Sequence, residues 1–86
     1  MIILVHFDWT GSKKALKKWN QQFKEACEKH DIKFKNIYIP LGHKFNFTWV
    51  LESENVDKYM EAAQTLTRPQ AMTHVITEFL IEKNLD

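Results

Sequence analysis

Residues 44–52 read Lys-Phe-Asn-Phe-Thr-Trp-Val-Leu-Glu, and large apolar side chains occupy every second position of this stretch. The apolar set is Phe45, Phe47, Trp49 and Leu51, and the set between them is Lys44, Asn46, Thr48 and Val50. Such alternation predicts a half-buried strand, because successive side chains of a strand point to opposite faces of a sheet. The aromatic face of this strand is expected to lie beneath helices.

Three further strands are predicted around this one. Apolar, β-branched runs place them at residues 2–8, 32–40 and 74–82. Pro40 and Gly42 end the second strand, and the stretch Pro-Leu-Gly-His that they belong to is short enough for a hairpin.

Two helices are predicted between the strands. Ser12 is a good helix N-cap, and residues 13–30 repeat apolar side chains every three or four positions. A second helix is expected from a cap at Ser53 or Asn55 to about Leu66, before the Arg68-Pro69 break. Residues 83–86 are expected to form a frayed tail.

The order β-α-β-β-α-β predicts one α+β domain over residues 1–86, with the ferredoxin-like arrangement. We expect a four-stranded antiparallel sheet in the order 4-1-3-2, with both helices on one face. A chain of 86 residues holds one core, and its stability margin is thin.

Composition and charge exclude some classes of binding partner and indicate a location. Twelve Lys and Arg against eleven Asp and Glu give a net charge of +1, which argues against a general polyanion binder. The single cysteine, Cys27, cannot form an internal disulfide, so a reducing, cytoplasmic location is expected. The apolar run at residues 1–5 is too short for a signal segment or a membrane span, so no membrane partner is expected.

Strand alternation divides the side chains between two sheet faces. The face expected beneath the helices carries Ile3, Val5, Phe7, Phe45, Phe47, Trp49, Leu51, Val75, Phe79 and Ile81. The other face is mixed and carries Ile2, Leu4, His6, Asp8, Asn46, Thr48, Val50, His74, Ile76, Glu78 and Leu80. Its aliphatic residues would form an apolar patch in water, so a second copy of the sheet is expected to cover it. A homodimer of this kind would enclose a partly polar interior suited to a small molecule.

The order of elements, the length and the helix opening Glu-Ser-Glu-Asn-Val-Asp-Lys-Tyr-Met at residues 52–60, after an aromatic strand, carry a family resemblance. Over nearly its whole length the chain resembles the dimeric α+β barrel superfamily, above all small uncharacterised members such as the GYD-domain proteins. The resemblance implies a homodimer. Members include cofactor-independent monooxygenases, isomerases, haem-degrading enzymes and proteins that only bind ligands, so it implies no particular chemistry.

Polar residues gather at one end of the mixed face in the predicted sheet. His6, Asp8, Asn46 and His74 fall there, with Thr48 and Glu78 one step further in. Two imidazoles near carboxylates can bind a divalent metal ion or act as acid and base. His6 and His74 are thus candidate metal ligands, and His6, His74 and Asp8 are candidate catalytic residues. The alternative is that both histidines only bond polar neighbours at the dimer edge.

Two aromatic residues complete the candidate ligand-binding set. Trp9 follows Asp8 at the strand end, where it lines a pocket mouth or packs under the first loop. Tyr38 points into the barrel if Phe34, Asn36 and Tyr38 share that face, and the opposite phase would place Ile37 and Ile39 there. His43 is expected to be a solvent-exposed turn residue, and Cys27 a core residue.

We therefore expect a homodimer that binds a small ligand or a metal ion in a pocket between its sheets. The alternatives are a cofactor-independent monooxygenase or isomerase acting on a small hydrophobic substrate, and a purely structural or regulatory dimer. RNA-recognition motifs share this order of elements and stack bases on aromatics of the central strands. Near-neutral charge and the expected burial of Phe47 and Trp49 argue against nucleic acid.

Overall fold

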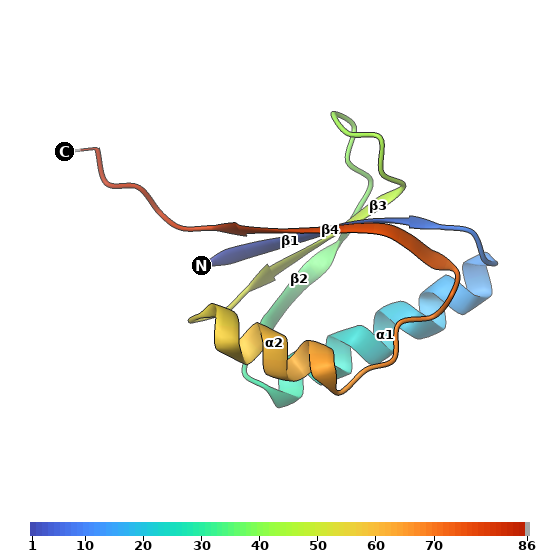
Figure 1. Ribbon diagram of the computed structural model, residues 1–86, viewed down its shortest axis with the longest axis horizontal. Coiled ribbons are helices and arrows are strands. Elements are labelled where there is room, and N and C mark those ends of the chain that lie inside the picture. Colours follow the sequence, from blue (N-terminus) through green and yellow to red (C-terminus); the bar gives the residue numbers. More distant parts are fainter. Residues whose placement is uncertain (86) are drawn as a thin grey trace.

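Strands and helices follow one another as predicted in the computed structural model, which describes residues 1–85 (Figure 1). The elements are β1 (Ile2–Trp9), α1 (Lys13–Lys29), β2 (Lys33–Tyr38), β3 (Phe47–Glu52), α2 (Val56–Gln64) and β4 (Met72–Leu80). The strands form one antiparallel sheet in the order β2-β3-β1-β4. This is the predicted ferredoxin-like α+β arrangement.

Both helices begin at side chains that cap free backbone amides. Ser12 Oγ accepts a hydrogen bond from the amide of Ala15 at 3.0 Å, as the sequence predicts. At α2 the cap is Asn55, whose Oδ1 accepts from the amide of Lys58 at 2.9 Å. Ser53, the alternative cap, instead donates its hydroxyl to the carbonyl of Asn55 at 2.8 Å. Each cap satisfies an amide that the first helical turn leaves unpaired.

The core lies between the helices and one face of the sheet (Figure 1). β1 and β3 supply its fully buried centre, with Ile3, Val5, Phe7, Trp49 and Leu51. From α1, Phe23 stacks on Trp49 with ring centroids 3.8 Å apart and an interplanar angle of 10°. Trp49 also donates its indole N–H to Asn20 Oδ1 at 2.8 Å, so its one polar atom is satisfied. The prediction that Trp49 lies beneath the helices is confirmed.

Phe45 does not lie on that face, and the connection between β2 and β3 is not a tight turn. β3 begins only at Phe47, and residues 39–46 form a loop that rises on the side of the sheet away from the helices (Figure 1). Pro40 has no N–H to extend the strand ladder. The ring of Phe45 instead stacks on His6, with centroids 5.3 Å apart and an interplanar angle of 21°. This connection is called the β2–β3 loop below.

Irregularities in the two edge strands decide side-chain directions that alternation leaves open. The register of β2 shifts between Phe34 and Asn36. As a result both Phe34 and Ile37 pack against the core, while Tyr38 pairs with Thr48 and is half exposed on the other face. Neither of the two regular phases considered for β2 is therefore correct over the whole strand, because a bulge reverses the alternation within it.

The end of β4 also departs from the prediction. Phe79 faces the helices as expected, with its ring 5.8 Å from that of Tyr59. Ile81, predicted for the same face, lies beyond the last strand residue and is exposed. Residues 81–85 have no regular structure, in line with the predicted tail, and Asp86 lies outside the described residues.

Candidate functional site

The sheet face that the helices leave uncovered, called the open face below, combines aliphatic and polar side chains. Its aliphatic residues remain accessible in the single chain: Ile2 is 42%, Ile76 52% and Leu80 43% exposed. Its polar residues are held in specific pairs. The candidate site lies where these two kinds of surface meet.

His6 is the centre of the polar part. Its Nδ1 lies 2.7 Å from the hydroxyl of Thr48, which is directly opposite on β3. Its Nε2 lies 2.5 Å from Oε1 of Glu78, two residues along β4 from its direct partner Ile76. Three strands thus hold one imidazole, and we call Thr48, His6 and Glu78 the His6 triad.

Hydrogen-bond chemistry assigns the roles within the His6 triad. An ionised carboxylate can only accept, so Nε2–H of His6 donates to Glu78. In the neutral imidazole Nδ1 is then the acceptor, and the Thr48 hydroxyl donates to it. Both ring nitrogens are therefore engaged within the chain. The side chain of His6 is 4% exposed whereas that of Glu78 is 47% exposed, so the group that an incoming molecule can reach is the carboxylate.

The β2–β3 loop buries His6 without any second subunit. Phe45 stacks on one side of the imidazole, and the ring centroid of His43 lies 4.8 Å away, tilted by 44°. His43 is exposed, as predicted, but it also belongs to the site, which the sequence does not suggest. The usable signal is the stretch between Pro40 and Phe47, because a connection of that length can fold back over the strand beside it.

A second polar pair lies at the end of β1. Nδ1 of His74 lies 3.0 Å from Oδ2 of Asp8 and donates to it, and the imidazole itself is largely exposed. The other oxygen of Asp8 accepts from the amide of Asn46 at 2.9 Å, and Asn46 Oδ1 accepts from the amide of Trp9. These reciprocal bonds fix the carboxylate. They also orient His74 so that its Nε2 points away from the carboxylate.

The bulge in β4 makes this pairing possible. The register between β1 and β4 shifts between His6 and Asp8, and His74 takes a positive φ of 52° there. A non-glycine residue at positive φ is uncommon and carries a conformational cost, so the surrounding contacts must hold it. Without the extra residue, a regular ladder would place a different β4 side chain beside Asp8.

The remaining predicted site residues take more peripheral positions. Trp9 donates its indole N–H to the carbonyl of Ser12 at 2.9 Å and lines a groove of about 740 Å³ beside the β2–β3 loop. Tyr38 lies on the open face opposite Thr48. The predicted gathering of polar residues is thus found as two separate pairs, each with one imidazole and one carboxylate.

The geometry gives no support to a metal site shared by His6 and His74. Each imidazole bonds a different carboxylate. Both ring nitrogens of His6 are already engaged, by Glu78 and by Thr48. Within residues 1–85, no group of three or more His, Cys, Asp or Glu side chains is arranged to hold a metal ion. The accessible chemistry of the site is therefore that of hydrogen-bond acceptors.

Cys27 lies far from this chemistry, in the core, as predicted. Burial raises the pKa of its thiol to about 12, with a smaller contribution from the nearby Glu28 carboxylate. Because the thiolate is the reactive form, we expect native Cys27 to resist iodoacetamide at pH 8 and to react at the rate of a free thiol once urea unfolds the chain. Mass spectrometry of timed samples measures both rates, and rapid native labelling would contradict the buried placement.

Comparison with known proteins adds no relative. No protein-family model matches the chain, and no curated protein matches it in sequence. Across residues 1–85, neither helix has the length and apolar character needed to cross a membrane. The site must therefore be interpreted from its own geometry.

Proposed function

We propose that this protein is a homodimer that pairs through its open face and binds a small molecule between the two sheets. The observation that carries the proposal is the composition of this face. Accessible Ile2, Ile76 and Leu80 lie beside a carboxylate that His6 holds in place. Apolar contact area together with a few fixed polar groups is the usual make-up of a ligand site.

The apolar part of the open face supports pairing with a second copy. Burying an exposed aliphatic patch lowers the free energy by about 25 cal/mol for each Å² removed from water. A C2 dimer uses the same patch twice, so each buried side chain contributes in both subunits. A domain of 86 residues gains more from such an interface than a large one, because its own core is small.

The polar part of the site supports one class of ligand. Glu78 offers its second carboxylate oxygen, and His74 offers the Nε2 lone pair that Asp8 leaves free. Both groups accept hydrogen bonds, so a complementary ligand presents an ammonium or hydroxyl group and an apolar body. A carboxylate ligand would instead be repelled by Glu78.

Sedimentation equilibrium tests the pairing directly. We expect the full chain to be dimeric at micromolar concentration and neutral pH. A mass that stays at 10.3 kDa over this range would overturn the proposal, since the aliphatic patch would then be wet in solution.

Matched amphiphiles test the ligand class. We expect hexylamine at millimolar concentration to raise the melting temperature, by about 2 °C or more, and hexanoate to leave it unchanged. Glu78→Gln should remove most of the hexylamine effect because it deletes the anionic acceptor, while Glu61→Gln on the outer side of α2 should retain it. Equal shifts with both amphiphiles would contradict a role for Glu78.

An acid–base enzyme is the second candidate, and one observation favours it. Asp8 holds Nδ1 of His74, which leaves Nε2 as an oriented base, the arrangement that general-base catalysis needs. His6 fits that role less well, since Thr48 and Glu78 occupy both of its nitrogens. An RNA-stacking platform has less support, because Phe47 and Trp49 face the helices while Thr48 and His6 occupy the open face.

A further inference from the structure

The β2–β3 loop carries apolar side chains at its tip that are exposed in the single chain. Leu41 is 96% exposed, and Ile39 beside it is also largely exposed. The loop stands above the open face rather than continuing the plane of the sheet (Figure 1). Ile39 and Leu41 together present apolar surface at the end of a projecting loop, where a second molecule can reach it.

Contacts at the base of the loop fix its direction. Phe45 stacks on the buried His6 ring, and His43 packs beside the same ring. The amide of His43 also donates to the carbonyl of Pro40 at 3.4 Å, which closes a turn around the tip. A loop held in this way loses little conformational entropy when its tip is buried.

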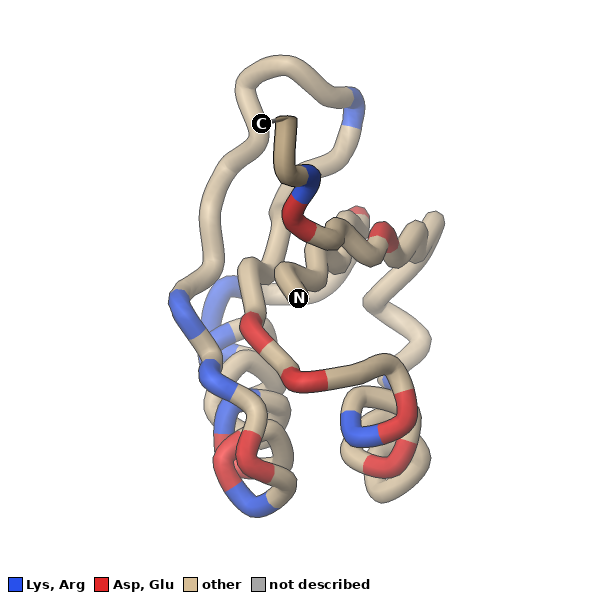
Figure 2. The backbone as a smooth tube through the Cα atoms, turned by 90° about the vertical axis from the view of Figure 1, so that its left-hand side faces the viewer, with Lys and Arg blue, Asp and Glu red and all other residues tan. Residues whose placement is uncertain are grey.

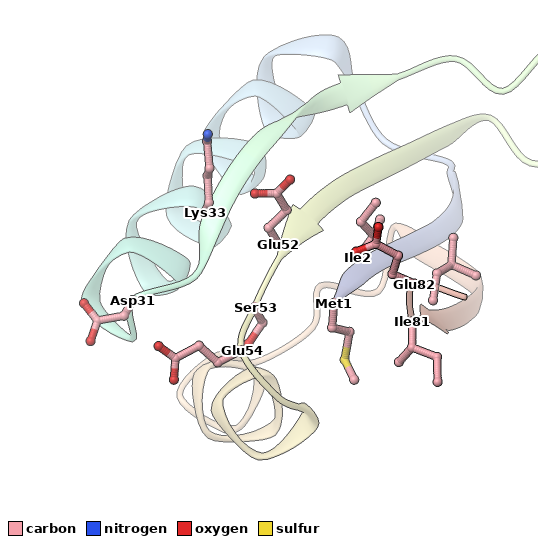
Figure 3. A pocket seen from close by; sticks show the side chains of 10 residues that line it. Met1, Ile2, Asp31, Lys33, Glu52, Ser53, Glu54, Ile81 and Glu82 are labelled. Atoms are coloured by element: carbon pink, nitrogen blue, oxygen red, sulfur yellow. The ribbon is translucent and has the colours of Figure 1, made fainter. Parts of the chain in front are cut away.

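A recess of about 660 Å³ lies at the other end of the sheet (Figure 3). The start of β1 and the end of β4 give it an apolar wall of Met1, Ile2, Leu80 and Ile81. Its rim carries four carboxylates and one lysine, namely Asp31, Glu52, Glu54, Glu82 and Lys33. The recess therefore has an accessible apolar wall and a mainly acidic rim.

The loop and the recess lie at opposite ends of β1. Ile2 borders the recess, and His6, beneath the loop, follows four residues later, about 13 Å along an extended strand. An isologous C2 interface uses the same patch of both copies, so a projection at one end of the patch can fill a depression at its other end. A second copy turned by 180° over the open face, about an axis that runs across the strands, brings each loop above the recess of the other copy.

We propose that in the homodimer Leu41 of each subunit inserts into the recess of its partner, between Ile2 and Leu80. This inference rests on the proposed pairing through the open face and specifies its geometry. It makes each ligand site a shared one, since a docked loop closes one end of the space between the sheets.

Charge complementarity favours a second copy as the occupant of the recess. The β2–β3 loop carries Lys44 and His43 and no acidic residue, whereas the recess rim is predominantly acidic. Figure 2 shows a basic position on the raised loop and acidic positions on the chain near the N-terminal end of the sheet. Within the rim, Glu52 forms an ion pair with Lys35 at 3.1 Å, and the hydrogen bond from Lys35 lowers the pKa of its carboxyl group.

Disulfide trapping tests the arrangement. In the double variant Leu41→Cys/Leu80→Cys, mild oxidation should give a covalent dimer, because a disulfide needs Cα atoms within about 7 Å. The control Leu41→Cys/Met60→Cys places the second thiol on α2, across the sheet, and should remain uncrosslinked. Native Cys27 is buried and does not compete.

Leu41→Asp supplies a second readout without new cysteines. We expect it to raise the dimer dissociation constant about a hundredfold, since two copies of the substitution lie in each C2 interface. The loop insertion would be overturned, and the pairing left intact, by three results together: the wild type is a dimer, Leu41→Asp does not change the dissociation constant, and Leu41→Cys/Leu80→Cys gives no crosslink. A monomeric wild type would overturn both.

Discussion

Replacing Trp49 with alanine is expected to lower the free energy of unfolding by about 3–5 kcal/mol, the range for a large aromatic residue in a packed core. Trp49 is 1% exposed, stacks on Phe23 and contacts Phe7, with ring centroids 3.8 and 4.7 Å away. Small domains have a total stability of about 5–15 kcal/mol, so the variant should be largely destabilised at 25 °C. Urea denaturation followed by circular dichroism measures the loss.

Trp9→Ala is the matched control for this prediction. Trp9 is only half-buried, and its indole N–H bonds a loop carbonyl. Hydrophobic stabilisation scales with the area removed from water, so its loss should be less than about half of that at Trp49. Equal losses at the two positions would contradict the assignment of Trp49 to the centre of the core.

Ile76→Lys is expected to weaken dimerisation at least about a hundredfold, that is, by about 3 kcal/mol for the two copies in the interface. Ile76 lies on β4 directly opposite His6, on the open face and midway along the strand. Burying its replacement would carry two ammonium groups into the contact between the sheets, and each carries a desolvation cost. The folded monomer should keep its stability, because the side chain is exposed in the single chain.

Met60→Lys serves as the control because Met60 resembles Ile76 in exposure, at 45% against 52%, but lies on α2. Its substitution should leave the dissociation constant unchanged. Analytical ultracentrifugation of both variants over the same concentration range makes the comparison. If Met60→Lys dissociated the dimer and Ile76→Lys did not, the helical layer rather than the open face would be the interface.

Local patterns were enough to predict the elements and their order. Alternation at residues 44–52 placed Trp49 and Leu51 beneath the helices, and the steps of three and four in residues 13–30 located α1. Side-chain oxygen chemistry at Ser12 predicted where α1 begins. These signals are readable because each depends only on residues a few positions apart.

The sequence predicted which residues belong to the candidate site better than it predicted which of them form hydrogen bonds with one another. His6, Asp8, Asn46, Thr48, His74 and Glu78 all lie on the open face or at its end. The pairing of His74 with Asp8 depends on the bulge in β4, whereas that of His6 with Glu78 follows from the regular register of β1 and β4. The sequence Thr73-His74-Val75 does not locate that bulge, because histidine adopts a positive φ more often than most residues but still uncommonly.

The sequence by itself determined which faces are apolar, which residues begin the helices and which strands are central, because burial and local hydrogen bonding follow from side-chain type and spacing. Only the tertiary structure decided that Phe45 leaves the core to stack on His6, and that the β2–β3 loop stands over the open face. Alternation assigns Phe45 to the helix face for as long as the strand continues. Where β3 begins depends on contacts between residues 39 positions apart in the chain, His6 and Phe45, and local periodicity carries no information about such contacts.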